Sequence, residues 1–132
     1  MLLEALFWLG IMRIAILTVP FRRIIEYYQL TQGEATTTPT ADDIAHADLV
    51  GWAVRSAASR TPWQSACLVQ SLAAMRMLRR RGIHGTLYLG VAKNEDNSAE
   101  PIAAHSWLCC DTSTLTGAFA DNRFTVIARF SW

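Results

Sequence analysis

The stretch SACLVQSLAAMRMLRRRGIHGTLYLGV, residues 65–91, changes its apolar period halfway along and so decides the fold class. Its first half predicts a helix, because apolar side chains recur at helical spacing at Leu68, Leu72 and Met75. Three arginines and then Gly82 follow, a pattern typical of the last turn and the end of a helix. The second half alternates instead, which predicts a strand whose one face carries Leu87, Leu89 and Val91.

Two more strands are expected downstream of this pair of elements. Ile102 to Cys110 alternates again, with His105, Trp107 and Cys109 facing one way. Asp111 to Thr114 has the composition of a turn, and a closing strand is expected over residues 124–130. Helices followed by an antiparallel meander predict an α+β fold, in which the helix of residues 65–82 packs on the sheet.

The chain upstream of residue 65 predicts further helices and a linker. Residues 2–28 are expected to be helical, with a kink or restart at Pro20, whose ring removes a backbone donor. Residues 31–39, TQGEATTTP, are polar and end in proline, which is typical of a linker. A helix then starts at Thr40 and runs to about Ser59, and residues that share one side of it are Leu49, Trp52, Ala53 and Ser56.

Length and composition limit the classes of protein to which the chain can belong. With 132 residues we expect one domain, divided into an apolar N-terminal helix and linker over 1–38 and a core over 39–132. Lys plus Arg number 12 and Asp plus Glu 11, a net charge of +1 that disfavours nucleic acid as a partner. Three cysteines make a disulfide framework unlikely to form and favour a reducing compartment, so we expect the protein in the cytoplasm, either free or peripheral to the inner membrane.

The apolar N-terminal segment has three possible fates. Arg13 divides residues 5–21 into two apolar runs of eight, whereas a membrane span needs about 20 mainly apolar residues. No secretory signal is expected, because only Glu4 carries charge ahead of the apolar run. The segment is expected to lie on a membrane surface, to pack on a partner protein, or to be buried against the core of its own domain.

Cys67 and His105 are the candidate catalytic residues. With Ser65 or a neighbour as the helix cap, Cys67 falls in the first turn, where unpaired amides favour a thiolate. His105 lies mid-strand and could accept the thiol proton. Gln64 and Trp63, together with the Cys67 amide, are candidates for an oxyanion pocket. The alternative is structural: a small buried thiol, a core or surface histidine, and a loop held by Trp63.

A metal or cofactor site is not expected. Cys109 and Cys110 are adjacent on a strand, so their side chains point to opposite faces and cannot act as one ligand pair. The sequence contains no CxxC, HExxH or glycine-rich phosphate loop, and we therefore expect no metal and no cofactor.

Five blocks in order resemble the lasso peptide leader peptidases, the family of the microcin J25-processing protein. They are SACLVQSLA from Ser65, LRRRGI from Leu78, LYLGV from Leu87, AHSWL from Ala104 and FTVIARF from Phe124, within roughly residues 45–132. The resemblance implies a transglutaminase-like or papain-like core with the nucleophile at a helix N-terminus. It implies a Cys-His-Asp triad and removal of the leader from a ribosomally made precursor peptide, with a threonine just inside the leader end.

The resemblance also implies partners. Some relatives carry a fused precursor-recognition domain, for which this chain has no room, so a separate leader-recognition protein is expected. The freed core peptide would pass to a lasso cyclase. Two other functions remain open: an acyltransferase or transglutaminase on the same scaffold, and a non-enzymatic membrane or complex adaptor.

The third member of the triad departs from the family pattern. The acid is expected on the strand after the histidine, but residues 115–120, LTGAFA, contain no carboxylate. If the turn is centred on Thr112 and Ser113, His105 faces Ala120 or Asp121, and Asp121 is therefore predicted. Asp111 lies about 20 Å along the strand from His105, too far unless the strand bends. An amide or a backbone carbonyl could also orient the imidazole.

Overall fold

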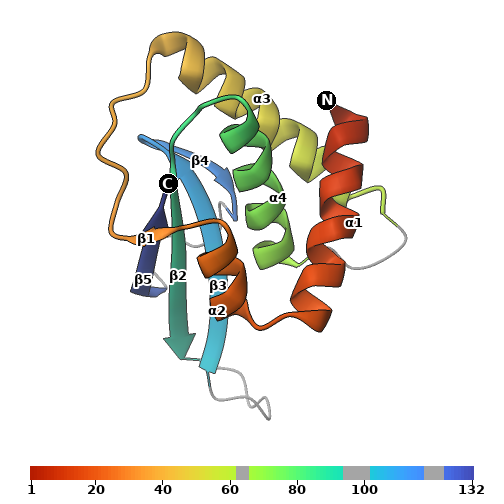
Figure 1. The fold of residues 1–132 in the computed structure, drawn as a ribbon, viewed down its shortest axis with the longest axis vertical. Coiled ribbons are helices and arrows are strands. Elements are labelled where there is room, and N and C mark those ends of the chain that lie inside the picture. The colour runs from red at the N-terminus through yellow and green to blue at the C-terminus, as the bar shows by residue number, and fades with distance from the viewer. Residues whose placement is uncertain (62–65, 94–101, 118–123) are drawn as a thin grey trace.

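The computed structural model describes residues 1–61, 66–93, 102–117 and 124–132 of the chain. These ranges hold four helices: α1 (Leu2–Thr18), α2 (Phe21–Tyr27), α3 (Ala41–Ala58) and α4 (Cys67–Arg80). They also hold five strands: β1 (Thr31–Gln32), β2 (Thr86–Lys93), β3 (Ile102–Cys110), β4 (Ser113–Thr116) and β5 (Thr125–Ser131). The helices pack against one antiparallel sheet, which confirms the α+β prediction (Figure 1).

The sheet has the order β1-β5-β2-β3-β4, and every neighbouring pair is antiparallel. β2 lies at its centre, so that Gly90 pairs with His105 of β3 and with Val126 of β5. The chain enters the sheet first at β1, where Thr31 pairs with Ser131 and Gln32 with Phe130. The prediction of a linker over 31–39 is thus wrong at its first two residues, because they add an edge strand to the last strand of the chain.

Helix boundaries follow the local chemistry of the sequence. Thr40 caps α3: its side chain accepts from the Asp43 amide at 3.1 Å, and the Asp43 carboxylate accepts from the Thr40 amide. This reciprocal capping box satisfies two amides that the first turn would leave unpaired. Val19 and Pro20 separate α1 from α2, as predicted, since proline lacks the donor that a continuous helix needs.

α4 is the helix around which the core forms. It contacts α1 and α3 and also the strands β3 and β4, and Figure 1 shows it between α1 and the sheet. Leu72, Met75 and Leu78 of α4 are fully buried, as are Leu87 of β2 and Leu108 of β3. Burial of side chains of this size contributes roughly 1.5 to 3 kcal/mol each, so the contact of α4 with the sheet is a large part of the stability.

The residues predicted to share one side of α3 differ in burial, and Ala53 alone among them is fully buried. Leu49 and Trp52 are each 51% exposed, whereas Val50, Ala53 and Val54 are fully buried. Small residues lie at the contact because the neighbouring elements approach closely: a Cβ at Gly51 would meet the carbonyl oxygen of Leu115 in β4 at 2.9 Å. Close approach, rather than side-chain size, therefore decides which face of α3 is buried.

α1 packs into the core on one side only. Ala5, Leu9 and Met12 are buried against α3 and α4, while Leu3 and Leu17 are 82% and 70% exposed. Of the three fates considered for this segment, burial in its own domain is thus observed for one face. Among the helices that the structure describes, none has the length and apolarity to cross a bilayer.

An ion pair holds α1 to the end of α4, and its contribution should depend on pH. Glu4 accepts from Arg81 at 2.6 Å and from Arg80 at 3.2 Å. The hydrogen bond from Arg81 lowers the pKa of Glu4 below its usual 4.5, against the opposing effect of burial. A pKa lowered by folding gives stability that is present above the unfolded value and is lost as the pH falls through the folded one.

We therefore expect Glu4→Gln to reduce the free energy of unfolding by about 1 kcal/mol or less at neutral pH, because both arginines are partly exposed. The difference from the parent protein should shrink as the pH falls below 4.5. Urea unfolding across this pH range measures it, with Glu26→Gln, an exposed glutamate of α2, as the matched control. A Glu4 effect that grows on acidification would contradict the ion pair.

Candidate active site

Cys67 occupies the first position of α4, as the sequence predicts. The capping residue is Ala66, and its side chain makes no hydrogen bond to the helix amides. First-turn amides carry partial positive charge, which stabilises a thiolate or an oxyanion placed beside them. The Cys67 side chain is partly exposed, so a substrate can reach it.

A cavity of about 330 Å³ opens beside Cys67. Cys67 and Leu68 of α4 form part of its wall, and the rest is contributed by three strands, with Leu89, Gly90, Val91, Ala104, His105, Ser106 and Ile127. Its lining is mostly aliphatic, which suits an apolar substrate segment with few polar contacts. Cys67 of α4 and His105 of β3 thus both border one cavity.

The His105 imidazole is held by three neighbours. Its ring centroid lies 5.2 Å from that of Phe124 and 6.2 Å from that of Trp107. Nε2 lies 3.2 Å from the carbonyl oxygen of Gly117. A carbonyl can only accept, so Nε2 must carry the proton in this contact. In a neutral imidazole with this tautomer, Nδ1 has no proton and is the nitrogen that can act as a base.

The structure does not place the two candidate catalytic side chains in contact. Within the described residues no hydrogen bond joins the Cys67 thiol to His105. Ser106 and Leu108 are buried beneath the helices, and side chains alternate along a strand. The ring of His105 therefore packs with Trp107 on the other face of β3. General base catalysis needs the two groups within about 3 Å, so the imidazole must move relative to Cys67 before it can accept the thiol proton.

Two other predicted site residues, Gln64 and Asp121, lie outside the described residues, as does Trp63. The hairpin that was used to choose Asp121 has a different turn. Cys110 pairs with Ser113, which centres the turn on Asp111 and Thr112, one residue earlier than predicted. Asp111 adopts a positive φ of 55° there, a conformation that aspartate tolerates better than most residues.

A bulge between Leu108 and Cys109 then shifts the register again, and the ladder of β3 and β4 ends at the pair Leu108 and Thr116. Beyond it the Gly117 carbonyl makes the contact with His105. The partner of the imidazole within the described residues is therefore a backbone carbonyl, one of the alternatives that the sequence left open.

Ser106 is a site residue that the sequence reasoning missed. Its side chain is 2% exposed, its hydroxyl has no hydrogen-bond partner within the described residues, and it lines the Cys67 cavity. A buried hydroxyl without a partner costs roughly 1 to 3 kcal/mol, so a substrate group that bonds to it would recover that energy. Strand alternation was the available signal, since it places the neighbour of His105 on the helix-facing side.

Cys109 and Cys110 do not line the Cys67 cavity. Burial raises the pKa of Cys109, partly offset by a contact of its sulfur with Thr114 at 3.6 Å. Burial also raises the pKa of Cys110, which Asp111 raises further. Both shifts disfavour the thiolate and so disfavour nucleophilic roles. Among the described residues no group of three or more His, Cys, Asp or Glu side chains could hold a metal ion.

Gly117 should be essential for the placement of His105. It has a positive φ of 69°, and a Cβ there would lie 2.5 Å from the Ser106 carbonyl oxygen and 3.0 Å from His105 Nε2. We expect Gly117→Ala to lower stability by more than about 2 kcal/mol and to displace the imidazole. Gly82→Ala is the matched control, because Gly82 has a φ of 70° and nothing within 4 Å of the added carbon.

Thermal melting and the imidazole nitrogen resonances of His105 would measure the two effects. Equal destabilisation by the two substitutions, with unchanged His105 resonances in Gly117→Ala, would show that Gly117 contributes backbone conformation alone.

Of three comparisons with known proteins, the one with protein families gives a match, and this match agrees with the architecture. No significant match is found among curated proteins or among solved structures. The model of the transglutaminase-like superfamily matches residues 15–129, which include α4, all of the cavity lining, the strands β1 to β4 in full and β5 as far as Arg129. This superfamily includes cysteine peptidases and acyltransferases. With most of its length matched, the chain belongs to the transglutaminase-like superfamily.

Proposed function

We propose that this protein is a cysteine peptidase that removes the leader from a ribosomally made lasso peptide precursor. The observation that carries the proposal is the position of Cys67, the first residue of α4, on a cavity that His105 also borders. Membership of a superfamily that includes cysteine peptidases supports the reaction class. The five sequence blocks support the choice of substrate.

In the proposed reaction the Cys67 thiolate attacks the carbonyl carbon of the last leader residue. The thiol proton passes to Nδ1 of His105, and the resulting imidazolium then protonates the leaving amine of the core peptide. The thioester that remains is hydrolysed by water, which His105 deprotonates, and the leader leaves with a new carboxylate. First-turn amides of α4 stabilise the oxyanion, and Gln64 is proposed to contribute to the same pocket.

His105 has to approach Cys67 for this reaction. Its ring rests against Trp107 and Phe124, and catalytic contacts that are open in a free enzyme often close in the substrate complex. The proposal therefore includes a rearrangement at β3 when a peptide fills the cavity. A separate leader-recognition protein delivers the peptide, and a lasso cyclase takes the released core.

The direct test combines the protein with a precursor peptide and its recognition protein, and follows the products by mass. Leader with a free carboxylate, together with core peptide, is the expected result. Capture of an added amine by the leader, in place of water, would instead identify an acyltransferase, the alternative that the superfamily also supports.

The separation of Cys67 from His105 favours a second candidate, a non-enzymatic adaptor that keeps the peptidase scaffold. In that case the recognition protein and precursor would bind to the chain, but no product of either reaction would form, even with peptide in excess. An unchanged precursor mass alongside measurable binding would identify this function.

Asp121 is proposed as the acid that orients His105. The flanking residues of segment 118–123, Gly117 and Phe124, both contact the imidazole, whereas Asp111 is exposed in the hairpin turn. We expect Asp121→Asn to slow leader release more than about tenfold, because the imidazole loses its orienting charge. Asp111→Asn is the control and should be close to normal. The opposite order of initial rates would move the acid to Asp111.

A further inference from the structure

One side of α1 presents large apolar side chains that the described part of the chain leaves uncovered. Leu3, Phe7, Ile14 and Leu17 are each more than half exposed, and their spacing places them along one side of the helix. Because Leu9 and Met12 on the other side are buried in the core, α1 cannot turn to hide these four residues. We call them the α1 stripe. An uncovered apolar surface of this kind marks an interaction site.

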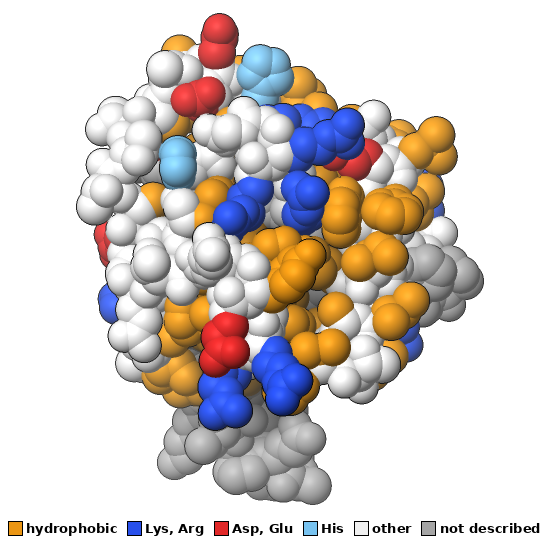
Figure 2. Space-filling view, viewed as in Figure 1, with side chains coloured by type: hydrophobic (Ala, Val, Ile, Leu, Met, Phe, Trp, Pro, Cys, Tyr) orange, Lys and Arg blue, Asp and Glu red, His pale blue; other side chains and the backbone are white. Residues whose placement is uncertain are grey.

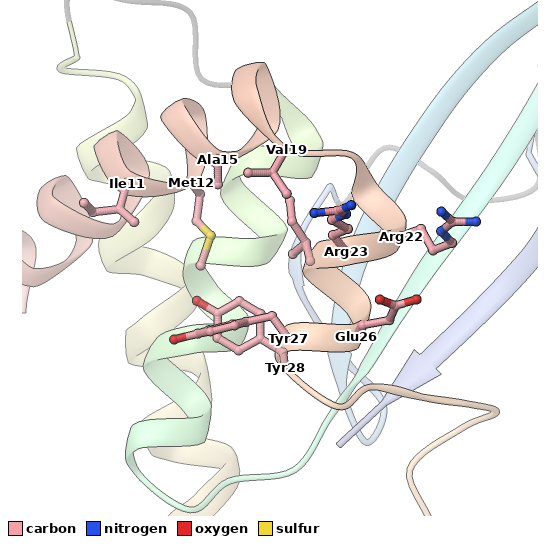
Figure 3. Close-up of a pocket in the computed structure, with 10 residues that line it drawn as sticks. Ile11, Met12, Ala15, Val19, Arg22, Arg23, Glu26, Tyr27 and Tyr28 are labelled. Atoms are coloured by element: carbon pink, nitrogen blue, oxygen red, sulfur yellow. The ribbon is translucent and has the colours of Figure 1, made fainter.

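An apolar groove lies on a neighbouring face of α1, and none of the four stripe residues lines it. Its volume is about 730 Å³, and it runs between the second half of α1 and α2, with Met12, Ala15, Val19 and Ile24 among its lining residues. Figure 3 shows the rings of Tyr27 and Tyr28 extending toward Met12 below the groove. Arg22 and Arg23 stand on its rim and are exposed, with Glu26 as the acidic residue beside them.

Positive charge is concentrated on the elements around the stripe. Residues 1–30 and 67–81 carry seven arginines and two glutamates, whereas the rest of the chain carries five basic and nine acidic residues. The arginines of α4 lie against α1 and α2: Arg76 stands 4.7 Å from the Trp8 ring, and Arg81 pairs with Glu4. Figure 2 shows Lys and Arg side chains bordering a hydrophobic area on this face.

We propose that α1 and α2 dock on a bilayer that contains anionic phospholipids, with α1 lying in the plane of the membrane surface. The α1 stripe would enter the acyl region, and the groove would admit part of a lipid tail. Arg22 and Arg23 would bind phosphates, and Tyr27, which is 80% exposed, would lie at the headgroup level where tyrosine is enriched. The active-site cysteine takes no part, so this proposal is independent of the proposed reaction.

Charge favours a lipid surface over a second copy of the chain. A two-fold dimer through the stripe would bring two copies of this surface, each with seven arginines and two glutamates, against one another, and like charges repel. An anionic surface attracts each arginine near it by about 1 kcal/mol at physiological salt. The stripe itself carries no polar group to specify a protein partner, whereas an acyl layer needs none.

The test uses the full chain and vesicle flotation. We expect the protein to float with vesicles of equimolar phosphatidylcholine and phosphatidylglycerol and to bind vesicles of pure phosphatidylcholine far more weakly. Arg22→Gln combined with Arg23→Gln should weaken binding to the anionic vesicles about 30-fold. Leu3→Gln combined with Leu17→Gln should weaken it at least about tenfold, through lost apolar burial.

Matched control variants distinguish specific binding through α1 and α2 from nonspecific adsorption to vesicles. Ile127→Gln replaces an aliphatic residue of β5 that is 63% exposed, and Arg60→Gln replaces an exposed arginine beyond α3, so both should bind like the parent chain. Melting temperatures of all variants check that each is folded. Equal binding to both vesicle types, or no binding to either, would overturn the proposal. So would a parent chain that self-associates and a Leu3 and Leu17 variant that loses this self-association while its lipid binding is unchanged.

Discussion

Replacing Cys67 by alanine should reduce leader release to background, a loss of at least about 10⁴-fold, while the melting temperature stays close to that of the parent chain. The thiol is partly exposed at the start of α4, so its removal leaves no large cavity. The proposed reaction has no other nucleophile, because burial raises the pKa of both Cys109 and Cys110. Product masses over a time course measure the loss.

Cys109→Ala is the matched control, since it removes a partly exposed thiol from β3 and Cys109 does not line the Cys67 cavity. It should retain normal leader release. His105→Ala should match the loss seen for Cys67→Ala, because two residues that act as one unit lose their effect together. His84→Ala, in the segment before β2, should retain normal leader release. Substantial release by Cys67→Ala would remove the basis for the proposed reaction.

Replacing both Leu9 and Met12 by alanine should abolish the cooperative melting transition. Each side chain is buried at the contact of α1 with α3 and α4, and each truncation costs roughly 2 to 5 kcal/mol. A domain has only about 5 to 15 kcal/mol in total, so the pair of substitutions approaches the whole of it. Near-UV circular dichroism during heating would report the loss.

Leu3→Ala combined with Leu17→Ala is the control on the same helix, because both residues point to solvent. We expect it to change stability by less than about 1 kcal/mol. Equal melting curves for the two double variants would mean that α1 is an accessory helix and not part of the core.

Local patterns in the sequence predicted most of the elements. Helical spacing at Leu68, Leu72 and Met75 and alternation in β2 and β3 are properties of neighbouring residues, and the structure has these elements where the patterns place them. The start of α4, with Cys67 as its first residue, follows from the same local information.

The predictions that differ from the structure concern features that depend on residues far away in the sequence. Thr31 and Gln32 become a strand only because Ser131 and Phe130 lie beside them. Leu49 and Trp52 are exposed, whereas smaller residues form the buried side of α3. The cause is the close approach of a neighbouring strand and not a feature of the helix itself.

At the site, the register of the hairpin depends on a bulge that composition does not reveal. The contact of His105 with Gly117 uses a backbone carbonyl, which carries no residue-type signal. To predict Ser106 as a site residue, one would need to know which face of β3 the helices cover.

The place of β5 in the sheet has a consequence for synthesis on the ribosome. β5 is the last strand in sequence, yet it lies between β1 and β2. Until residues 125–131 have emerged, β2 has an unpaired edge and β1 has no neighbour, although all four helices are already made. Pairs such as Thr31 with Ser131 close loops of about a hundred residues, which slows folding. The nascent chain therefore has an open sheet edge until β5 emerges. Chains with such an edge can pair wrongly with one another, and chaperones bind them in this state.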